Sequence, residues 1–222
     1  MSKKHTPPKK TTGDLAHTAA KTAIATIPVI GGIAAELFQQ VVTPPLDRRR
    51  QAWMEEIAEG LEKLEENERI QIKELSNNDQ FVSSLMQASQ IAMRTHNEEK
   101  RTALRNAALN ASLPTAPEDA IQQMFLNFID FFTEWHLRIL KLVQAPPKLP
   151  GVTMGGMELI LAKGYPELKG RQVFCDQIWR DLWSRGLVSS DSLRGMTSVH
   201  GLEAKRTTEF GDKFLEFIAT PV

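Results

Sequence analysis

Apolar residues recur at the spacing of an α-helix along most of the chain. Residues 14–42 carry small and apolar residues every three or four positions, and the prolines of the following TPPLD segment predict a turn that ends this helix. Residues 47–76 have the pattern of an amphipathic surface helix. The segment 81–113 predicts one long helix or two short ones, with the preceding SNND supplying the N-cap. Residues 118–144 form the most apolar predicted helix, which we expect at the centre of a bundle.

The pattern changes after APPKLPG, a proline-rich segment that predicts an extended linker. Beyond it, helical periodicity continues to a stop at Gly186. A stretch rich in Ser, Gly and Thr follows, in which residues 196–199 and 202–207 are expected to pair as a short β-hairpin, and a closing helix ends the chain. Helices, a hairpin and a closing helix follow the order of a winged helix-turn-helix domain.

The predicted fold class is therefore mainly α, with an N-terminal helical bundle followed by a small winged-helix-like domain that contains a short β-hairpin. The expected divisions are a flexible basic tail (1–13), the helical bundle (14–145), the proline-rich linker (146–151) and the winged-helix-like domain (152–222).

Composition sets broad limits on function. The chain has 222 residues, and 41% hydrophobic content is enough to bury a core. Lys plus Arg and Asp plus Glu both number 27, so no overall field favours nucleic acid or an acidic substrate, and charge has to be considered region by region. Cys175 is the single cysteine, which excludes an intramolecular disulfide and a thiolate metal cluster, and we expect it on a buried helix face. The apolar run near the start fits a secretory signal poorly, so we place the protein in the cytoplasm.

No set of residues in the sequence supports catalysis. Adjacent carboxylates such as Glu55 and Glu56 diverge by about 100° on a helix and cannot share a proton or a metal. Glu134 and His136 fail by the same geometry. No Walker-type loop, dinucleotide fingerprint or metal-binding helix motif occurs. We expect a non-enzymatic protein with no catalytic residue, no cofactor and no metal.

The first predicted helix has a face of small residues. Ala23, Ile27, Gly31 and Ala35 form a ladder at four-residue spacing, with Gly32 beside it, and such ladders allow close helix contact in proteins and membranes. The uncharged stretch is too short to predict a constitutive membrane anchor. A tail with four lysines precedes it, and lysines near an apolar helix favour anionic lipid. Close packing in a soluble core is the simpler interpretation, and self-association or contact with an anionic membrane surface is the functional one.

Basic residues in the predicted winged-helix-like domain raise a DNA-binding hypothesis. The recognition helix would carry Arg171, Arg180 and Arg185, and the wing would carry Lys205 and Arg206. Acidic residues are interleaved with these basic ones, and no strongly basic face emerges from the pattern. We therefore rank DNA below a membrane or protein partner.

Several segments together resemble a known family. The small-residue first helix, the segment FLNFIDFFTEWHLRILKLV (125–143), the proline linker and the closing TTEFGDKFLEFI (207–218) are similar to the abortive infection alpha family of bacterial proteins. The residues that carry the resemblance are Asp130, Thr133, His136, Gly211 and Phe214. None of them is a catalytic signature, and the resemblance transfers no active site.

The resemblance implies a role in phage defence, in which an infected cell is killed or arrested before phage is released. Our own hypothesis is that the small-residue helix acts at the inner membrane, where the cytoplasmic protein would associate peripherally. The alternatives are a winged-helix DNA-binding regulator and a protein-interaction adaptor, the latter including a scaffold whose bundle accepts another helix in an apolar groove.

Overall fold

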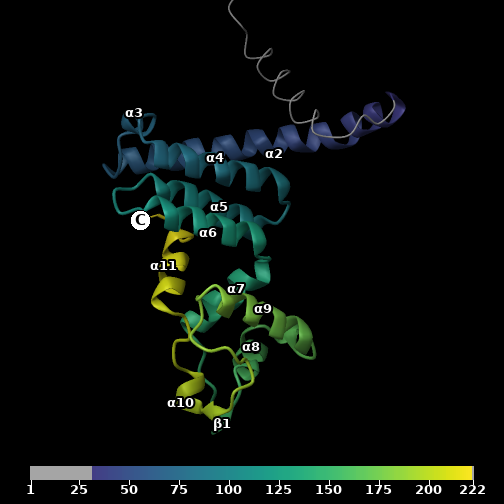
Figure 1. Cartoon of the computed structure of the whole chain (residues 1–222), viewed down its shortest axis with the longest axis vertical. Helices are drawn as coiled ribbons and strands as arrows, with labels where there is room; N and C mark the ends of the chain where they lie inside the picture. The colour runs from purple at the N-terminus through teal and green to yellow at the C-terminus, as the bar shows by residue number, and fades with distance from the viewer. Residues whose placement is uncertain (1–31, 222) are drawn as a thin grey trace, which may run out of the picture. The chain divides into compact units, whose positions relative to one another are not determined.

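The computed structural model describes residues 32–221, with side chains from residue 39 onward, and residues 49–222 form one compact unit (Figure 1). The described chain is mainly helical, with one small antiparallel sheet. Its elements, in order, are α2 (Gly32–Glu66), α3 (Ile72–Leu75), α4 (Asp79–Arg94), α5 (Glu98–Ala111), α6 (Asp119–Phe131), α7 (Glu134–Gln144), β1 (Met154–Gly155), α8 (Glu158–Gly164), the 3-10 turn η1 (Pro166–Leu168), α9 (Gln172–Ser184), β2 (Thr197–Ser198), α10 (Val199–Leu202) and α11 (Glu209–Phe217).

Helix α2 corrects two expectations. It continues through Pro44 and Pro45, so the turn predicted at TPPLD is wrong. Proline fixes φ near −65°, which lies in the helical range, and its cost here is two missing backbone donors rather than a break. The helix then ends at Glu66, before the predicted end at residue 76, because the chain turns where Glu68 adopts a positive φ of 56°.

Side-chain caps divide the next predicted helices. Asn78 accepts a hydrogen bond from the Phe81 N–H at 3.0 Å and begins α4, as predicted for the SNND segment. Asn97 accepts from the Lys100 N–H at 3.0 Å and begins α5, so the region 81–113 contains two helices. Helices α4, α5 and α6 run side by side (Figure 1), and the alanine-rich face of α5 lies buried between its neighbours.

The most apolar predicted helix is divided as well. Phe132 has extended backbone angles (φ −69°, ψ 144°), and α7 begins after Thr133. The His136 ring accepts the Thr133 N–H at 3.1 Å, which satisfies a donor at the start of α7. Periodicity did not reveal this break, because Phe132 is completely buried and fits the apolar stripe on both sides of it.

Helix α11 joins the last part of the chain to the helical layer. Phe125 of α6 lies 5.0 Å from Phe210 and 5.3 Å from Phe214, measured between ring centroids. On α5, the Asn106 amide donates to the Ile218 carbonyl at 3.0 Å, and the Asn110 amide donates to carbonyls at the same helix end. Both sides of the proline-rich segment therefore belong to the compact unit, and the division proposed at 146–151 stays a prediction.

The small sheet does not have the predicted hairpin pairing. Met154 pairs with Ser198 and Gly155 pairs with Thr197, so β2 is the partner of β1. Residues 199–202 are helical, because the Ser198 hydroxyl caps α10. The hairpin expected between 196–199 and 202–207 is therefore wrong.

A second antiparallel contact closes a longer loop. Val188 bridges Thr207, and two backbone hydrogen bonds flank the bridge: Ser189 N–H to Arg206 O at 2.9 Å, and Thr208 N–H to Leu187 O at 3.1 Å. Together they close the loop 190–205 directly after α9 and before α11.

Candidate functional site

The membrane and self-association residues lie largely outside the described part of the chain. Ala23, Ile27 and Gly31 precede residue 32. Gly32 and Ala35 lie at the start of α2, where side chains are not described. None of the helices in the described residues is both long and apolar enough to cross a membrane.

Three of the five predicted nucleic-acid residues are held by contacts within the protein. Arg185 donates to the Asp181 carbonyl at 3.1 Å, and its guanidinium lies 4.0 Å from the centroid of the Phe131 ring. Lys205 Nζ donates to an Asp212 carboxylate oxygen at 2.6 Å. Arg206 is half-buried and donates to the Gly201 carbonyl. These cations stabilise the loop 190–205 and the end of α9.

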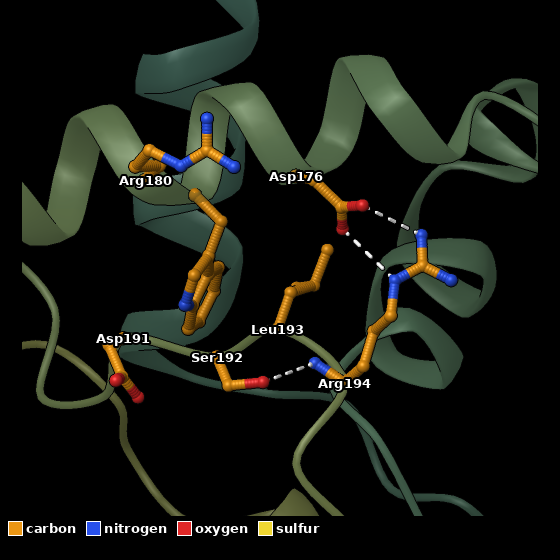
Figure 2. A pocket seen from close by; sticks show the side chains of 7 residues that line it. Asp176, Arg180, Asp191, Ser192, Leu193 and Arg194 are labelled. Atoms are coloured by element: carbon orange, nitrogen blue, oxygen red, sulfur yellow. Dashed lines mark hydrogen bonds and ion pairs between the residues drawn. The ribbon is translucent and has the colours of Figure 1, made fainter.

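Arg180 lies beside a pocket between α9 and the loop that follows it (Figure 2). The pocket has a volume of about 260 Å³, and Leu193 contributes to its lining. Arg194 makes two hydrogen bonds to Asp176, at 3.1 and 3.0 Å, across one side of it. Arg180 itself donates only to Gln177 at 3.3 Å, so its charge is not neutralised by an ion pair in the described residues.

Arg171 belongs to a face that the sequence had not identified. Three aromatic and three basic side chains come together where α8 turns into α9, next to α7. We call this set the turn face: Trp135, Lys163, Tyr165, Lys169, Arg171 and Phe174.

The local sequence GYPELKGR builds the turn. Pro166 begins η1, and Gly170 has a φ of 83°, a left-handed conformation that a glycine adopts without strain. Lys169 and Arg171 lie on either side of this glycine, just before α9, and both are exposed. Alternating basic and aromatic residues in 163–174 were a visible signal, whereas Trp135 joins only through the packing of α7.

The turn face has cations without acidic partners. Within the described residues, Lys163, Lys169 and Arg171 make no ion pair, and all three are exposed. Glu167 is the acidic residue within the turn itself. Burial raises the pKa of the Tyr165 hydroxyl, which keeps it a neutral donor toward the Arg138 carbonyl. The turn face therefore combines aromatic rings with three cations that form no ion pair in the described part of the chain, and the acidic neighbours of Tyr165 and Arg138 are Glu99, Glu134 and Glu167.

A buried histidine links α7 to α9. His136 Nδ1 lies 2.9 Å from the Thr133 hydroxyl, and Nε2 lies 3.3 Å from an Asp181 carboxylate oxygen. The ring stacks on Phe132, with 4.7 Å between centroids. Burial lowers the His136 pKa more strongly than Asp181 raises it, so the ring is neutral at pH 7.

The Thr133 hydroxyl, the His136 imidazole and the Asp181 carboxylate follow the order of a catalytic nucleophile, its base and the carboxylate that orients the base. Here, however, Nδ1 also accepts the Thr133 N–H, and the ring is nearly completely buried. We assign the network to capping α7 and holding α9 against it. Cys175 is buried as predicted, and burial raises its pKa, so the thiol stays protonated.

The described residues contain no group of three His, Cys, Asp or Glu side chains arranged to hold an ion.

Comparisons with protein-family models, curated proteins and solved structures give no match for this chain.

Proposed function

We propose that this chain is a non-enzymatic protein of bacterial phage defence whose molecular activity is nucleic-acid binding through a winged-helix-like arrangement. The observation that carries the molecular activity is the turn face, where three exposed cations that form no ion pair within the described residues share one turn with aromatic rings, and Arg171 lies over the Phe174 ring. The resemblance to the abortive infection alpha family supports the cellular role.

The order of elements supports the winged-helix interpretation. Helices α8 and α9 are joined by the turn at 165–171, and α9 is followed by the bridge between Val188 and Thr207. The loop 190–205 then takes the place of a wing, and α11 closes the arrangement. In helix-turn-helix proteins the first turn of the second helix contacts the nucleic acid, and Arg171 is at the equivalent place here.

Salt-dependent binding tests the molecular activity. The purified chain would be titrated against fluorescently labelled DNA and RNA, single-stranded and duplex, from about 50 to 200 mM salt. Each phosphate contact contributes about 0.7 to 0.9 to the slope of log affinity against log salt. We expect a slope of about 2 to 3 from the three turn-face cations. The absence of salt-sensitive binding to every nucleic acid tested would contradict the proposal.

Phage plating tests the cellular role. Cells that express the chain should reduce the plating of at least one phage, and cells that express a turn-face variant with Lys169→Glu and Arg171→Glu should not. Two of the residues that carry the family resemblance have packing roles: Gly211 lies against the Leu187 backbone, and Phe214 is buried among other phenylalanines. Full plating on cells that express the wild-type chain, over a broad phage panel, would contradict this role.

The membrane version of the proposal rests on the basic tail and the small-residue helix. Gly31→Leu should abolish cell killing without lowering the melting temperature, because a larger side chain blocks close helix contact. Flotation with anionic liposomes, compared with a chain lacking residues 1–46, measures the association directly. Full toxicity and phage protection in Gly31→Leu cells would rule this version out.

The adaptor version is favoured by two exposed apolar side chains on α9, Val173 (84% exposed) and Trp183 (47%). Tryptophan is enriched among residues that dominate protein interfaces. A Trp183→Ser chain that binds nucleic acid normally but no longer protects against phage would support this version. Normal protection by the same variant would contradict it.

A further inference from the structure

We infer that the turn face binds single-stranded nucleic acid in preference to duplex. This inference rests on the proposed nucleic-acid binding and names the class of ligand for the same site. It comes from the arrangement of three aromatic rings at the same turn as cations that form no ion pair in the part of the chain that the structure describes.

The rings come from α7, from the turn after α8 and from α9. Trp135 of α7 lies 5.5 Å from Tyr165 and 6.4 Å from Phe174, measured between ring centroids. Both pairs are nearly perpendicular, at 90° and 87°. Each ring is half-buried, so each keeps some surface open to solvent. The buried part of each ring packs on the hydrophobic core.

Two arginines lie over these rings, and they differ in whether a carboxylate accepts hydrogen bonds from the guanidinium. The Arg138 guanidinium is 5.0 Å from the Trp135 ring centroid, and Glu99 accepts a forked pair of hydrogen bonds from it. The Arg171 guanidinium is 4.0 Å from the Phe174 ring centroid and makes no hydrogen bond in the described residues. The ring holds the face of the Arg171 guanidinium, and the N–H groups at its edge are free to donate to phosphate oxygens.

Lysines extend the positive surface around the rings. Lys163 and Lys169 lie at the two ends of the turn, and Lys141 is exposed one helical turn after Arg138 on α7. The end of α8 lies against α7 here, since a Cβ at Gly164 would meet the Leu142 side chain at 2.6 Å. Lys141 directly precedes Leu142 in the sequence, and Lys163 directly precedes Gly164.

Aromatic side chains distinguish single strands from duplexes. In a duplex the base faces are stacked on one another, so a protein aromatic ring gains little from them unless it distorts the helix. In a single strand the bases can stack on aromatic rings or on guanidinium planes, and the phosphates follow a line of cations. Aromatic rings with neighbouring unpaired cations are therefore better suited to a single strand.

Fluorescence anisotropy with four probes tests the inference: oligo-dT and oligo-U of about 20 nucleotides, a mixed-sequence DNA duplex of similar length, and vesicles containing anionic lipid. The full-length chain is compared with Lys169→Glu/Arg171→Glu. The matched control is Arg69→Glu/Lys73→Glu, which makes the same charge change at exposed residues near α3, at the opposite end of the compact unit from α8 (Figure 1).

We expect tighter binding to the single strands than to the duplex. The Lys169→Glu/Arg171→Glu variant should lose at least about tenfold in single-strand affinity, and its salt slope should fall by about 1.4, which is two contacts at 0.7 each. The control should stay within about twofold of the wild type in both quantities. Phe174→Leu keeps the side chain apolar but removes the ring under Arg171, so it should weaken single-strand binding about tenfold and duplex binding less.

Each other outcome overturns a stated part of the inference. Duplex binding equal to or tighter than single-strand binding overturns the ligand class but leaves the proposed nucleic-acid binding in place. Failure to bind any oligonucleotide overturns both. Vesicle binding that depends on Lys169 and Arg171, without oligonucleotide binding, assigns the turn face to anionic lipid instead. An equal loss of affinity in the control variant shows that the turn face is not the site.

Discussion

The two ends of α9 carry the same kinds of residue and use them differently. At the C-terminal end, Arg185 donates to a backbone carbonyl and lies over the Phe131 ring. At the N-terminal end, Lys169 and Arg171 are exposed and have no ion-pair partner in the described residues. The basic residues at the two ends therefore differ in whether the fold supplies a carboxylate or carbonyl for them.

The difference follows from what surrounds each end. The C-terminal end of α9 contacts the α6–α7 junction and is followed at once by Leu187, against which α11 lies. The N-terminal end follows an exposed turn and borders one face of α7. Substitutions at the first end should therefore change stability, and substitutions at the second should change binding.

The largest effect is expected from Gly211→Ala, in the part of α11 that lies against the residues following the C-terminal end of α9. A Cβ on Gly211 would lie 2.2 Å from the Leu187 carbonyl oxygen, and neither backbone can move without displacing α11. We expect the free energy of unfolding, measured by urea denaturation, to fall by about 3 kcal/mol. Gly195→Ala is the control, because its Cβ would meet nothing closer than 3.9 Å. Equal stability of the two variants would show that α11 does not approach Leu187 closely.

The most direct comparison of the two ends pairs Arg185→Ala with Arg171→Ala. Arg185→Ala removes a backbone hydrogen bond and contacts with aromatic rings, and it should lower the free energy of unfolding by about 2 kcal/mol without changing nucleic-acid affinity. Arg171→Ala should cost about 0.5 kcal/mol and weaken binding several-fold. Denaturation and anisotropy on both variants measure this. Reversed effects would break the distinction between the two ends.

The His136 network should make stability depend on pH. Burial lowers the His136 pKa in the folded chain below its ordinary value, so the unfolded chain binds the proton more readily. Stability is therefore complete above about pH 6.5 and falls as the pH decreases, by up to about 1.4 kcal/mol per pH unit. Thr133, Asp181, Arg185 and Lys100 surround the ring and stay in place in His136→Asn. This variant should be less stable at pH 7, and its stability should change less between pH 7 and 5.5; parallel pH curves would contradict the assignment.

The smallest effect is expected from Lys205→Ala. Its ion pair with Asp212 is 2.6 Å long, but half of the lysine side chain is exposed, so we expect a loss of about 0.5 kcal/mol that decreases further at high salt. Nucleic-acid affinity should stay within about twofold. A large loss of affinity would mean that the loop 190–205 contacts the ligand. Binding would then not be confined to the N-terminal end of α9.

The sequence predicted local structure well where a signal lay within one segment. The mainly α fold, the cap before α4, the stop at Gly186 and the closing helix α11 all follow from short-range patterns, and the structure confirms them. Predictions failed where one sequence pattern was compatible with two different structures. Pro44 and Pro45 fit the interior of α2 as well as a turn, and Phe132 fits a continuous stripe as well as a buried break.

The candidate site was only partly predictable. Arg171 was among the predicted nucleic-acid residues, and Arg180 also forms no ion pair within residues 39–221, but the sequence did not separate them from Arg185, Lys205 and Arg206. That separation depends on distant partners such as Phe131 and Asp212. The membrane residues lie outside the described side chains, so their role stays a prediction.

By itself, the sequence determined that the chain is mainly helical, where some helices begin and end, and that Cys175 faces the core, because each of these depends on neighbours a few positions away. The tertiary structure alone decided that Trp135 joins a turn thirty residues later, that β1 pairs with β2, and which cations stay unpaired. Such contacts depend on how helices pack, and packing is set by the whole core rather than by any one segment.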